Sequence, residues 1–167
     1  MRALVGDGVT LEPQVAAHAT ELFAAIGDPA LYRYIDQAAP ASEAALGERL
    51  GKLESRLSPD GIEHWLNWVV RNASGEVVGY VQATVYPTHE AEIAYVLGKT
   101  HWRRGYAYAA CRAMIDELQM SYGVTCLIAT LDPQNAASLA LLEKLGLGLV
   151  SEDRAANEVT FALDLQP

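Results

Sequence analysis

The chain has 167 residues, of which 51% are hydrophobic and 20% charged, with a formal net charge of −9. This length fits a single domain over residues 1–167 with a sizeable core, and the composition excludes disordered and fibrous proteins. The acidic balance argues against non-specific nucleic-acid binding, and we expect a cytoplasmic protein because no apolar stretch suits a signal peptide or a membrane span.

The first third of the sequence predicts one short strand followed by two helices. Residues 9–12 suit a strand, and an apolar face at helical spacing continues from Pro13 to about Ile26. A second helix is expected to begin at the capping residue Ser42 and to run to about Leu57, where a Ser-Pro-Asp-Gly turn ends it.

From residue 63 onward, alternating polarity predicts a run of strands. The predicted elements are strands over 65–71, 77–86 and 91–97, a helix over 105–122, a strand over 124–131, a helix from Asn135 to Leu145, and short strands near 147–152 and 158–165. The turn residues at 72–75 indicate that the first two strands are antiparallel neighbours. The continuous apolar run over 124–131 predicts a central strand in a parallel pairing, buried on both faces.

Two cysteines, Cys111 and Cys126, lie within these apolar segments and lack the CxxC or Cys/His spacing of metal sites. We therefore expect two buried free thiols in a reducing compartment. Neither a disulfide nor a zinc site is predicted.

The strongest chemical signal lies between residues 92 and 108. A predicted strand ends there, and four basic residues follow within six positions: Lys99, His101, Arg103 and Arg104. Gly105 then opens a helix, where a small residue lets several unpaired N–H groups converge and the helix dipole adds about half a positive charge. Such a site suits a pyrophosphate. The sequence contains neither a GxxxxGKS/T phosphate loop nor a GxGxxG dinucleotide fingerprint.

Two spaced motifs carry a family resemblance. The stretch AEIAYVLGKTHWRRGYAYAA, over residues 91–110, resembles the AEIGYxL and W-x-x-G-Y-A-x-x-A patterns of GNAT-superfamily N-acetyltransferases, and most closely the ribosomal-protein alanine N-acetyltransferase branch. Asn135-Ala-Ala-Ser138, followed by Leu142-Glu-Lys-Leu-Gly146, resembles the N-x-x-S and L-E-K-L-G patterns downstream. The resemblance implies an α/β (α+β) fold with a mixed, mostly antiparallel sheet of about six or seven strands, about four flanking helices, and a splay between strands 4 and 5.

The resemblance also implies acetyl-CoA as the acyl donor and no metal. Backbone groups at the end of the fourth strand would hold the pantetheine arm, amides at the start of the following helix the pyrophosphate, and the next helix would line the thiol end. The residues assigned in this way are Val96, Leu97, Arg103, Arg104, Gly105, Tyr106, Ala107, Tyr108, Asn135 and Ser138. An oxyanion donor is expected from a strand N–H near Val96.

Acyl transfer to an amine needs a proton acceptor for the amine and a proton donor for the leaving thiolate. Glu92 is the first candidate for the base, with a water relay as the alternative base. An ion pair with a surface or neighbouring-strand cation is the alternative role of Glu92. His89 is a weaker candidate. Ser138 is the candidate acid, although serine is also common in the first turn of a helix.

The acceptor is expected to be a primary amine, either a peptide N-terminus or a small molecule. The alternatives are a transferase for a longer acyl-CoA such as succinyl-CoA, a non-catalytic acyl-CoA sensor, or a structural interaction protein. We expect no nucleic-acid or membrane partner, and a monomer or a homodimer. The aromatic residues Tyr32, Tyr34, Trp65 and Trp68 are expected to contribute to the core and to the wall of the acceptor site.

Overall fold

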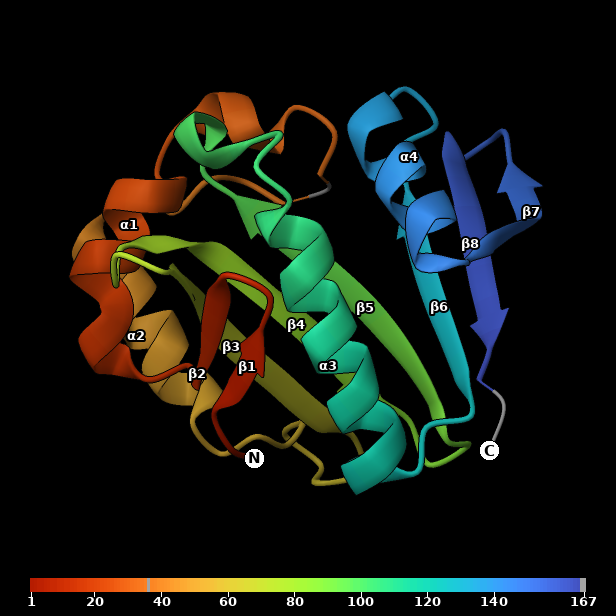
Figure 1. Ribbon diagram of the computed structural model, residues 1–167, viewed down its shortest axis with the longest axis horizontal. Helices are drawn as coiled ribbons and strands as arrows, with labels where there is room; N and C mark the ends of the chain where they lie inside the picture. The colour runs from red at the N-terminus through yellow and green to blue at the C-terminus, as the bar shows by residue number, and fades with distance from the viewer. Residues whose placement is uncertain (36, 166–167) are drawn as a thin grey trace.

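One mixed sheet of eight strands organises the computed structural model, which describes residues 1–35 and 37–165 (Figure 1). The strand order is β1-β2-β3-β4-β5-β6-β8-β7. The strands are β1 (Leu4–Gly6), β2 (Val9–Pro13), β3 (His64–Asn72), β4 (Val77–Val85), β5 (Glu90–Leu97), β6 (Cys126–Leu131), β7 (Gly148–Asp153) and β8 (Glu158–Asp164). All neighbouring pairs are antiparallel except β5 and β6, which are parallel. The mixed, mostly antiparallel sheet is confirmed, with more strands than predicted.

Helices cover both faces of this sheet, and each face has its own apolar cluster. The helices are α1 (Ala19–Ile26), α2 (Glu43–Leu53), α3 (Tyr106–Tyr122) and α4 (Ala136–Leu145), with short 3-10 turns η1 (Ala16–His18), η2 (Pro29–Tyr32) and η3 (Lys99–His101). Helices α3 and α4 pack on one face, which is in front in Figure 1, and α1 and α2 pack against Val69, Val77, Tyr80 and Val96 on the other. None of these helices, within the described residues, is long and apolar enough to cross a membrane.

The N-terminal elements differ from the prediction in two ways. A strand that was not predicted, β1, pairs with β2 through a tight turn at Gly8, whose φ is +70°. Helix α1 begins at Ala19 and not at Pro13, because Pro13 is still paired with Trp68 of β3 and the next amide, of Gln14, donates to Asn67 O at 2.9 Å.

Helix α2 begins where the sequence predicts and ends earlier. The Ser42 hydroxyl accepts a hydrogen bond from Ala45 N at 3.1 Å, which confirms the N-cap. The predicted end near Leu57 is wrong, because Arg56 adopts a left-handed φ of +62° and Leu57 forms an isolated bridge with His64. The chain therefore leaves the helix to run beside the start of β3.

The parallel pair β5–β6 is short, and this positions the site. Its registered residues are only Glu90–Glu92 with Cys126–Ile128, after which the two strands separate. The splay predicted between strands 4 and 5 is thus present. It lies between β5 and β6, because the additional strand β1 raises the number of each later strand by one. The prediction that β6 is buried on both faces is wrong: Leu127 and Ala129 are buried and Thr130 is exposed, because no residue of β6 belongs to the cluster under α1 and α2.

The two cysteines differ in burial. Cys111 is one of the buried residues of α3, and burial raises the pKa of its thiol to about 12. Cys126 is only half-buried, which corrects the prediction for that residue. Both thiols are free.

Candidate functional site

A cleft of about 510 Å³ lies where β5 and β6 separate. Its walls come from Ile93–Val96 of β5, Ala129–Leu131 of β6 and the first turns of α4. Arg33, Tyr34, Ile35 and Gln37 close it on one side, and the turn at 156–158 between β7 and β8 closes it on another. The cleft therefore reaches both faces of the sheet.

The edge of β5 that faces this cleft offers unpaired backbone groups. Gly98 N donates to Val78 O, and Tyr86 N to Glu90 O, each at 2.9 Å, with an unbroken register between them. Even-numbered residues of β5 therefore exchange hydrogen bonds with β4, and the backbone N–H and C=O groups of Tyr95 and Leu97 point toward β6.

This alternation changes the expectation for Val96. Its backbone is paired with Tyr80 of β4, although the residue lines the cleft. The N–H groups nearest to Val96 that can reach the cleft are those of Tyr95 and Leu97. Leu97 O accepts a hydrogen bond from Trp102 Nε1 at 2.8 Å, so the loop after β5 is tied to this strand edge.

The start of α3 presents a second set of free donors. Gly105 caps the helix with φ +83°, and no atom lies within 4 Å of the point where a Cβ would be placed. The first intrahelical bond runs from Ala109 N to Gly105 O at 3.0 Å. The amides of Tyr106, Ala107 and Tyr108 are therefore the unpaired donors of the first turn, at the positive end of the helix dipole.

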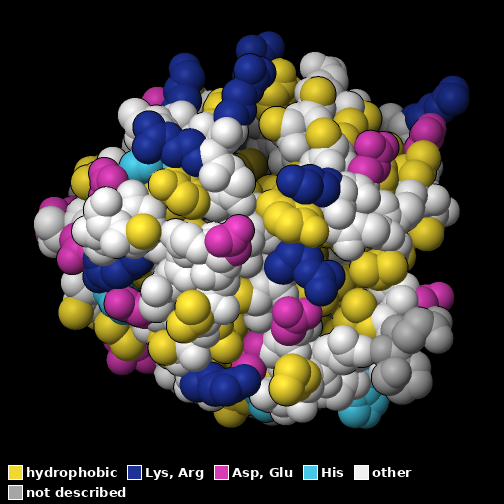
Figure 2. Space-filling model, in the orientation of Figure 1, with side chains coloured by type: hydrophobic (Ala, Val, Ile, Leu, Met, Phe, Trp, Pro, Cys, Tyr) yellow, Lys and Arg dark blue, Asp and Glu magenta, His cyan; other side chains and the backbone are white. Residues whose placement is uncertain are grey.

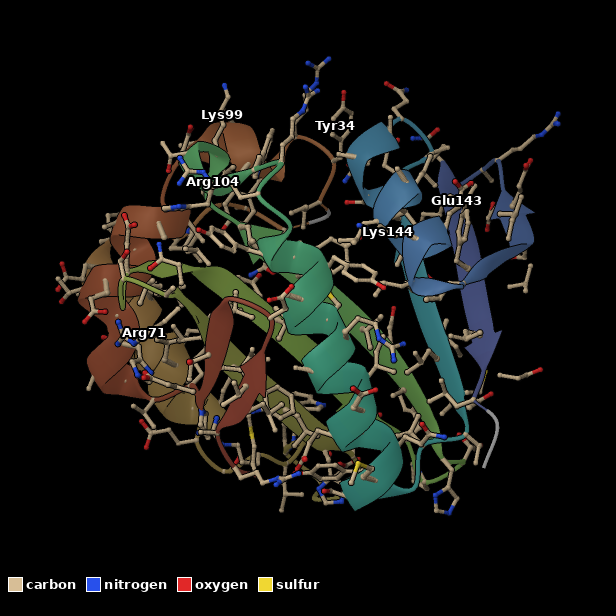
Figure 3. The ribbon with its side chains drawn as sticks, in the orientation of Figure 1. Tyr34, Arg71, Lys99, Arg104, Glu143 and Lys144 are labelled. Atoms are coloured by element: carbon tan, nitrogen blue, oxygen red, sulfur yellow. The ribbon has the colours of Figure 1, made fainter. Side chains whose placement is uncertain are left out.

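Cations surround this helix start. Lys99, Arg103 and Arg104 are exposed, and none of them forms an ion pair with a described carboxylate. Lysine and arginine side chains gather along the upper edge of the face in Figure 2, and Figure 3 labels Lys99 and Arg104 there. Although His101 belongs to the same basic run of sequence, it is 8% exposed, with Nε2 3.7 Å from Glu76 Oε1. It is not part of the exposed basic surface.

Asn135 and Ser138 both line the cleft from the start of α4. Asn135 is the N-cap, and its Oδ1 accepts from Ser138 N at 3.2 Å. Tyr95 Oη donates to Ser138 O at 3.3 Å, which ties β5 to α4 across the gap between the strands. Burial raises the pKa of Tyr95, so this phenol stays protonated. The backbone of Ser138 is thus fixed beside the cleft on both its N–H and its C=O.

Glu92 lies at the apex of the splay, in the last registered pair with Ile128, and outside the residues that line the cleft. Its carboxylate accepts a hydrogen bond from Tyr86 Oη at 3.0 Å. Burial and this contact raise the pKa of Tyr86 to about 12. His89 is exposed in the turn before β5 and is also outside the lining.

Two other carboxylates line the cleft, those of Asp132 and Glu158. Asp132 Oδ1 accepts from Gln134 N at 2.7 Å, whereas the Glu158 carboxylate has no hydrogen bond or ion pair within the described residues. Glu158 was not predicted as a site residue, because it begins a short C-terminal strand outside any motif. Among the four aromatic residues considered, Tyr34 lines the cleft, while Tyr32, Trp65 and Trp68 do not. No group of three His, Cys, Asp or Glu among the described residues is arranged to hold a metal ion.

Comparisons with known proteins agree with this geometry. A family model described as an acetyltransferase (GNAT) domain matches residues 9–148. The N-acetyltransferase p20 of Bacillus licheniformis is 26% identical over 147 residues, which cover 87% of this chain and 82% of that protein.

Two solved structures have the same fold. The GNAT-family acetyltransferase of Bacillus anthracis matches with a TM-score of 0.80 and 18% identity, over 97% of this chain and 98% of that one. The ribosomal-protein-S5-alanine acetyltransferase of Vibrio fischeri matches with a TM-score of 0.77 and 17% identity, over 97% and 96%. These low identities show likeness of fold alone.

Proposed function

The chain belongs to the GNAT family of acetyltransferases, which take the acetyl group from acetyl-CoA, and we propose that the cleft between β5 and β6 binds this donor and brings it to a primary amine. The observation that carries the proposal is the start of α3. Three free amides and the exposed Arg103 and Arg104 stand there, and they follow the end of β5 that lies beyond its registered pairing with β6.

The residues present fit the two ends of the donor. A pyrophosphate needs open space, converging N–H groups and positive charge, and all three occur around Gly105. The pantetheine arm carries amides that can bond to a free strand edge, and Tyr95 and Leu97 offer one. We assign the pyrophosphate to the amides of residues 106–108 with Arg103 and Arg104, and the thiol end to the region of Val96, Asn135 and Ser138.

When bound, acetyl-CoA supplies the acetyl group as an activated thioester. The N–H groups of Tyr95 and Leu97 face the cleft, so either can donate to the oxygen that becomes negative during transfer. Ser138 is proposed to deliver a proton to the departing sulfur, because its residue lines the cleft and its backbone is fixed by Asn135 and Tyr95. These groups need no rearrangement of the sheet.

Two carboxylates, those of Glu158 and Glu92, are the proposed alternatives for the base that accepts the proton of the amine. Glu158 is supported by its place in the lining and by its lack of another partner. Glu92, the first candidate from the sequence, is supported by its position at the apex of the splay, and because it lies outside the lining it acts through water. Substitution by glutamine of whichever glutamate is the base is expected to lower kcat far more than it changes the affinity for acetyl-CoA.

The acceptor is proposed to be a peptide N-terminus or a small primary amine. Arg33, Tyr34 and Gln37 line one side of the cleft, and the carboxylates of Asp132 and Glu158 favour an ammonium group. The Vibrio fischeri structure is named a ribosomal-protein-S5-alanine acetyltransferase, which makes short alanine-led peptides the first acceptors to test.

The test is an assay of thiol release from acetyl-CoA, with alanine-led peptides and with a panel of small amines. Release with one of these acceptors, lost in the Ser138→Ala variant, supports the proposal. Tight binding of acetyl-CoA without release for any amine would favour an acyl-CoA sensor. Release only from succinyl-CoA would assign a longer acyl donor. Absence of binding by any acyl-CoA would contradict the proposed site.

A further inference from the structure

A cation from α4 lies over the ring of Tyr108, a residue in the first turn of α3, the helix whose start is proposed to bind the pyrophosphate. Lys144 Nζ is 4.3 Å from the centroid of the Tyr108 ring. Lys144 is exposed, and no ion pair joins it to a carboxylate among the described residues. Figure 3 shows Lys144 on the side of α4 that faces α3, while its neighbour Glu143 lies on the side toward β8.

This position places positive charge close to the free amides. Tyr108 is the third residue of α3, so its Cα is only about 3 Å farther along the axis than that of Tyr106. Arg103 and Arg104 approach the same helix start from the preceding loop, and Lys144 approaches it from α4. Two separate elements, the loop before α3 and helix α4, therefore supply cations to the region of this helix start.

A cation–π contact and the negative end of the α4 dipole can each hold a lysine at this place. Neither the aromatic ring nor the helix dipole carries a full negative charge that would neutralise the charge of Lys144. The nearby Arg112 is different: it lies one turn farther along α3, and its Nη2 is 3.2 Å from Asp116 Oδ1. Lys144 is thus a cation near the helix start that is held in place and still free to bind an anion.

Coenzyme A carries three phosphates, two in the pyrophosphate and one on the 3′ oxygen of the ribose, a few bonds away. We infer that Lys144 binds this third phosphate, and that the protein thereby discriminates coenzyme A from dephospho-coenzyme A. The inference rests on the proposed function, because it takes the pyrophosphate to lie at the start of α3. It adds a specificity-determining residue that the acyl-transfer chemistry does not require.

The experiment is calorimetric titration of four proteins with coenzyme A and with dephospho-coenzyme A: the parent chain, Lys144→Gln, Lys144→Arg and Arg112→Gln. The parent and the Arg112→Gln variant are expected to prefer coenzyme A by about 5- to 10-fold, the range of a partly exposed charge-assisted contact. Lys144→Gln is expected to lose this preference by weakening coenzyme A binding alone, and Lys144→Arg to retain it. The melting temperature of each variant checks its folding.

Two results overturn the inference and leave the proposed function standing. One is a parent protein that binds both ligands equally well. The other is a Lys144→Gln variant that weakens both ligands by the same factor, because that result assigns Lys144 a role in packing on Tyr108 only. A parent protein that binds neither ligand contradicts the proposed function itself.

Discussion

Gly79 of β4 is expected to be the residue whose methyl substitution most directly deforms the cleft. Its φ is +151°, and a Cβ built there would lie 2.1 Å from Val96 O and 2.7 Å from Leu97 Cα. The first distance is 0.9 Å below the 3.0 Å that real Cβ atoms essentially never pass. Because both atoms are backbone, β5 itself must move in the Gly79→Ala variant.

The expected loss of unfolding free energy is about 3 kcal/mol, from about 1–3 kcal/mol of overpacking and about 1 kcal/mol or more of backbone strain. The displaced segment contains Leu97, whose N–H is proposed to reach the donor. We therefore expect kcat/KM to fall by about 100-fold, the effect of a displacement of about 1 Å at a reacting site. Denaturant unfolding and the thiol-release assay measure the two effects.

Gly47 of α2 provides the matched control. A Cβ at this position would meet only Ala19 Cβ, at an ordinary distance of 3.5 Å. Gly47→Ala is therefore expected to stabilise the protein by about 0.5–1 kcal/mol, because alanine favours a helix, and to leave activity unchanged. A Gly79→Ala protein with parental stability and activity would refute the reasoning about the edge of β5.

Three further predictions concern single side chains. If Glu158 is the base, Glu158→Gln lowers kcat by about 100-fold while the affinity for acetyl-CoA stays within about twofold. Glu92→Gln then lowers kcat less. A larger loss of kcat in Glu92→Gln than in Glu158→Gln, in steady-state assays, would return the role of base to Glu92. Trp102→Phe removes the donor to Leu97 O and is expected to weaken acetyl-CoA binding by about 5- to 10-fold in calorimetry, whereas an unchanged affinity would show that this contact does not hold the loop. Glu117 is 3% exposed, and its hydrogen bonds with Arg2 at 2.7 and 2.9 Å lower the pKa of its carboxylate below 4.5. The contribution of the ionised Glu117 to stability is therefore present above pH 4.5 and lost as the pH falls through the lowered pKa. In urea unfolding, the Arg2→Ala variant is expected to lose less unfolding free energy on acidification than the parent. Equal losses in the two proteins would contradict the linkage.

Much of the site was predictable because its signals are local. Gly105 before a helical period, followed by Asn135 and Ser138 at the next helix start, marks two N-termini. The structure has helices beginning at both places, and the second start lines the cleft. A cap and a left-handed glycine depend on residues only a few positions away, and this is why the sequence predicts them well.

Features set by tertiary contact were missed. Glu158 reaches the cleft through the order β6-β8-β7, which no local pattern reveals. His101 is basic in sequence and buried in the fold, against Gly98 and near Glu76. Which residues of β5 face the cleft depends on the pairing with β4, so the sequence could indicate the end of this strand but not the choice between Val96 and Leu97.

Binding of acetyl-CoA at the start of α3 is the central claim, and calorimetry of Gly105→Glu tests it most directly. The matched control is Gly61→Glu, because Gly61 has a similar φ of +75° and equally open space, far along the chain from α3. We expect the control to bind acetyl-CoA like the parent and Gly105→Glu to show no binding at millimolar ligand, since its carboxylate would occupy the phosphate position. Equal binding by both variants would contradict the claim that the donor lies at this helix start.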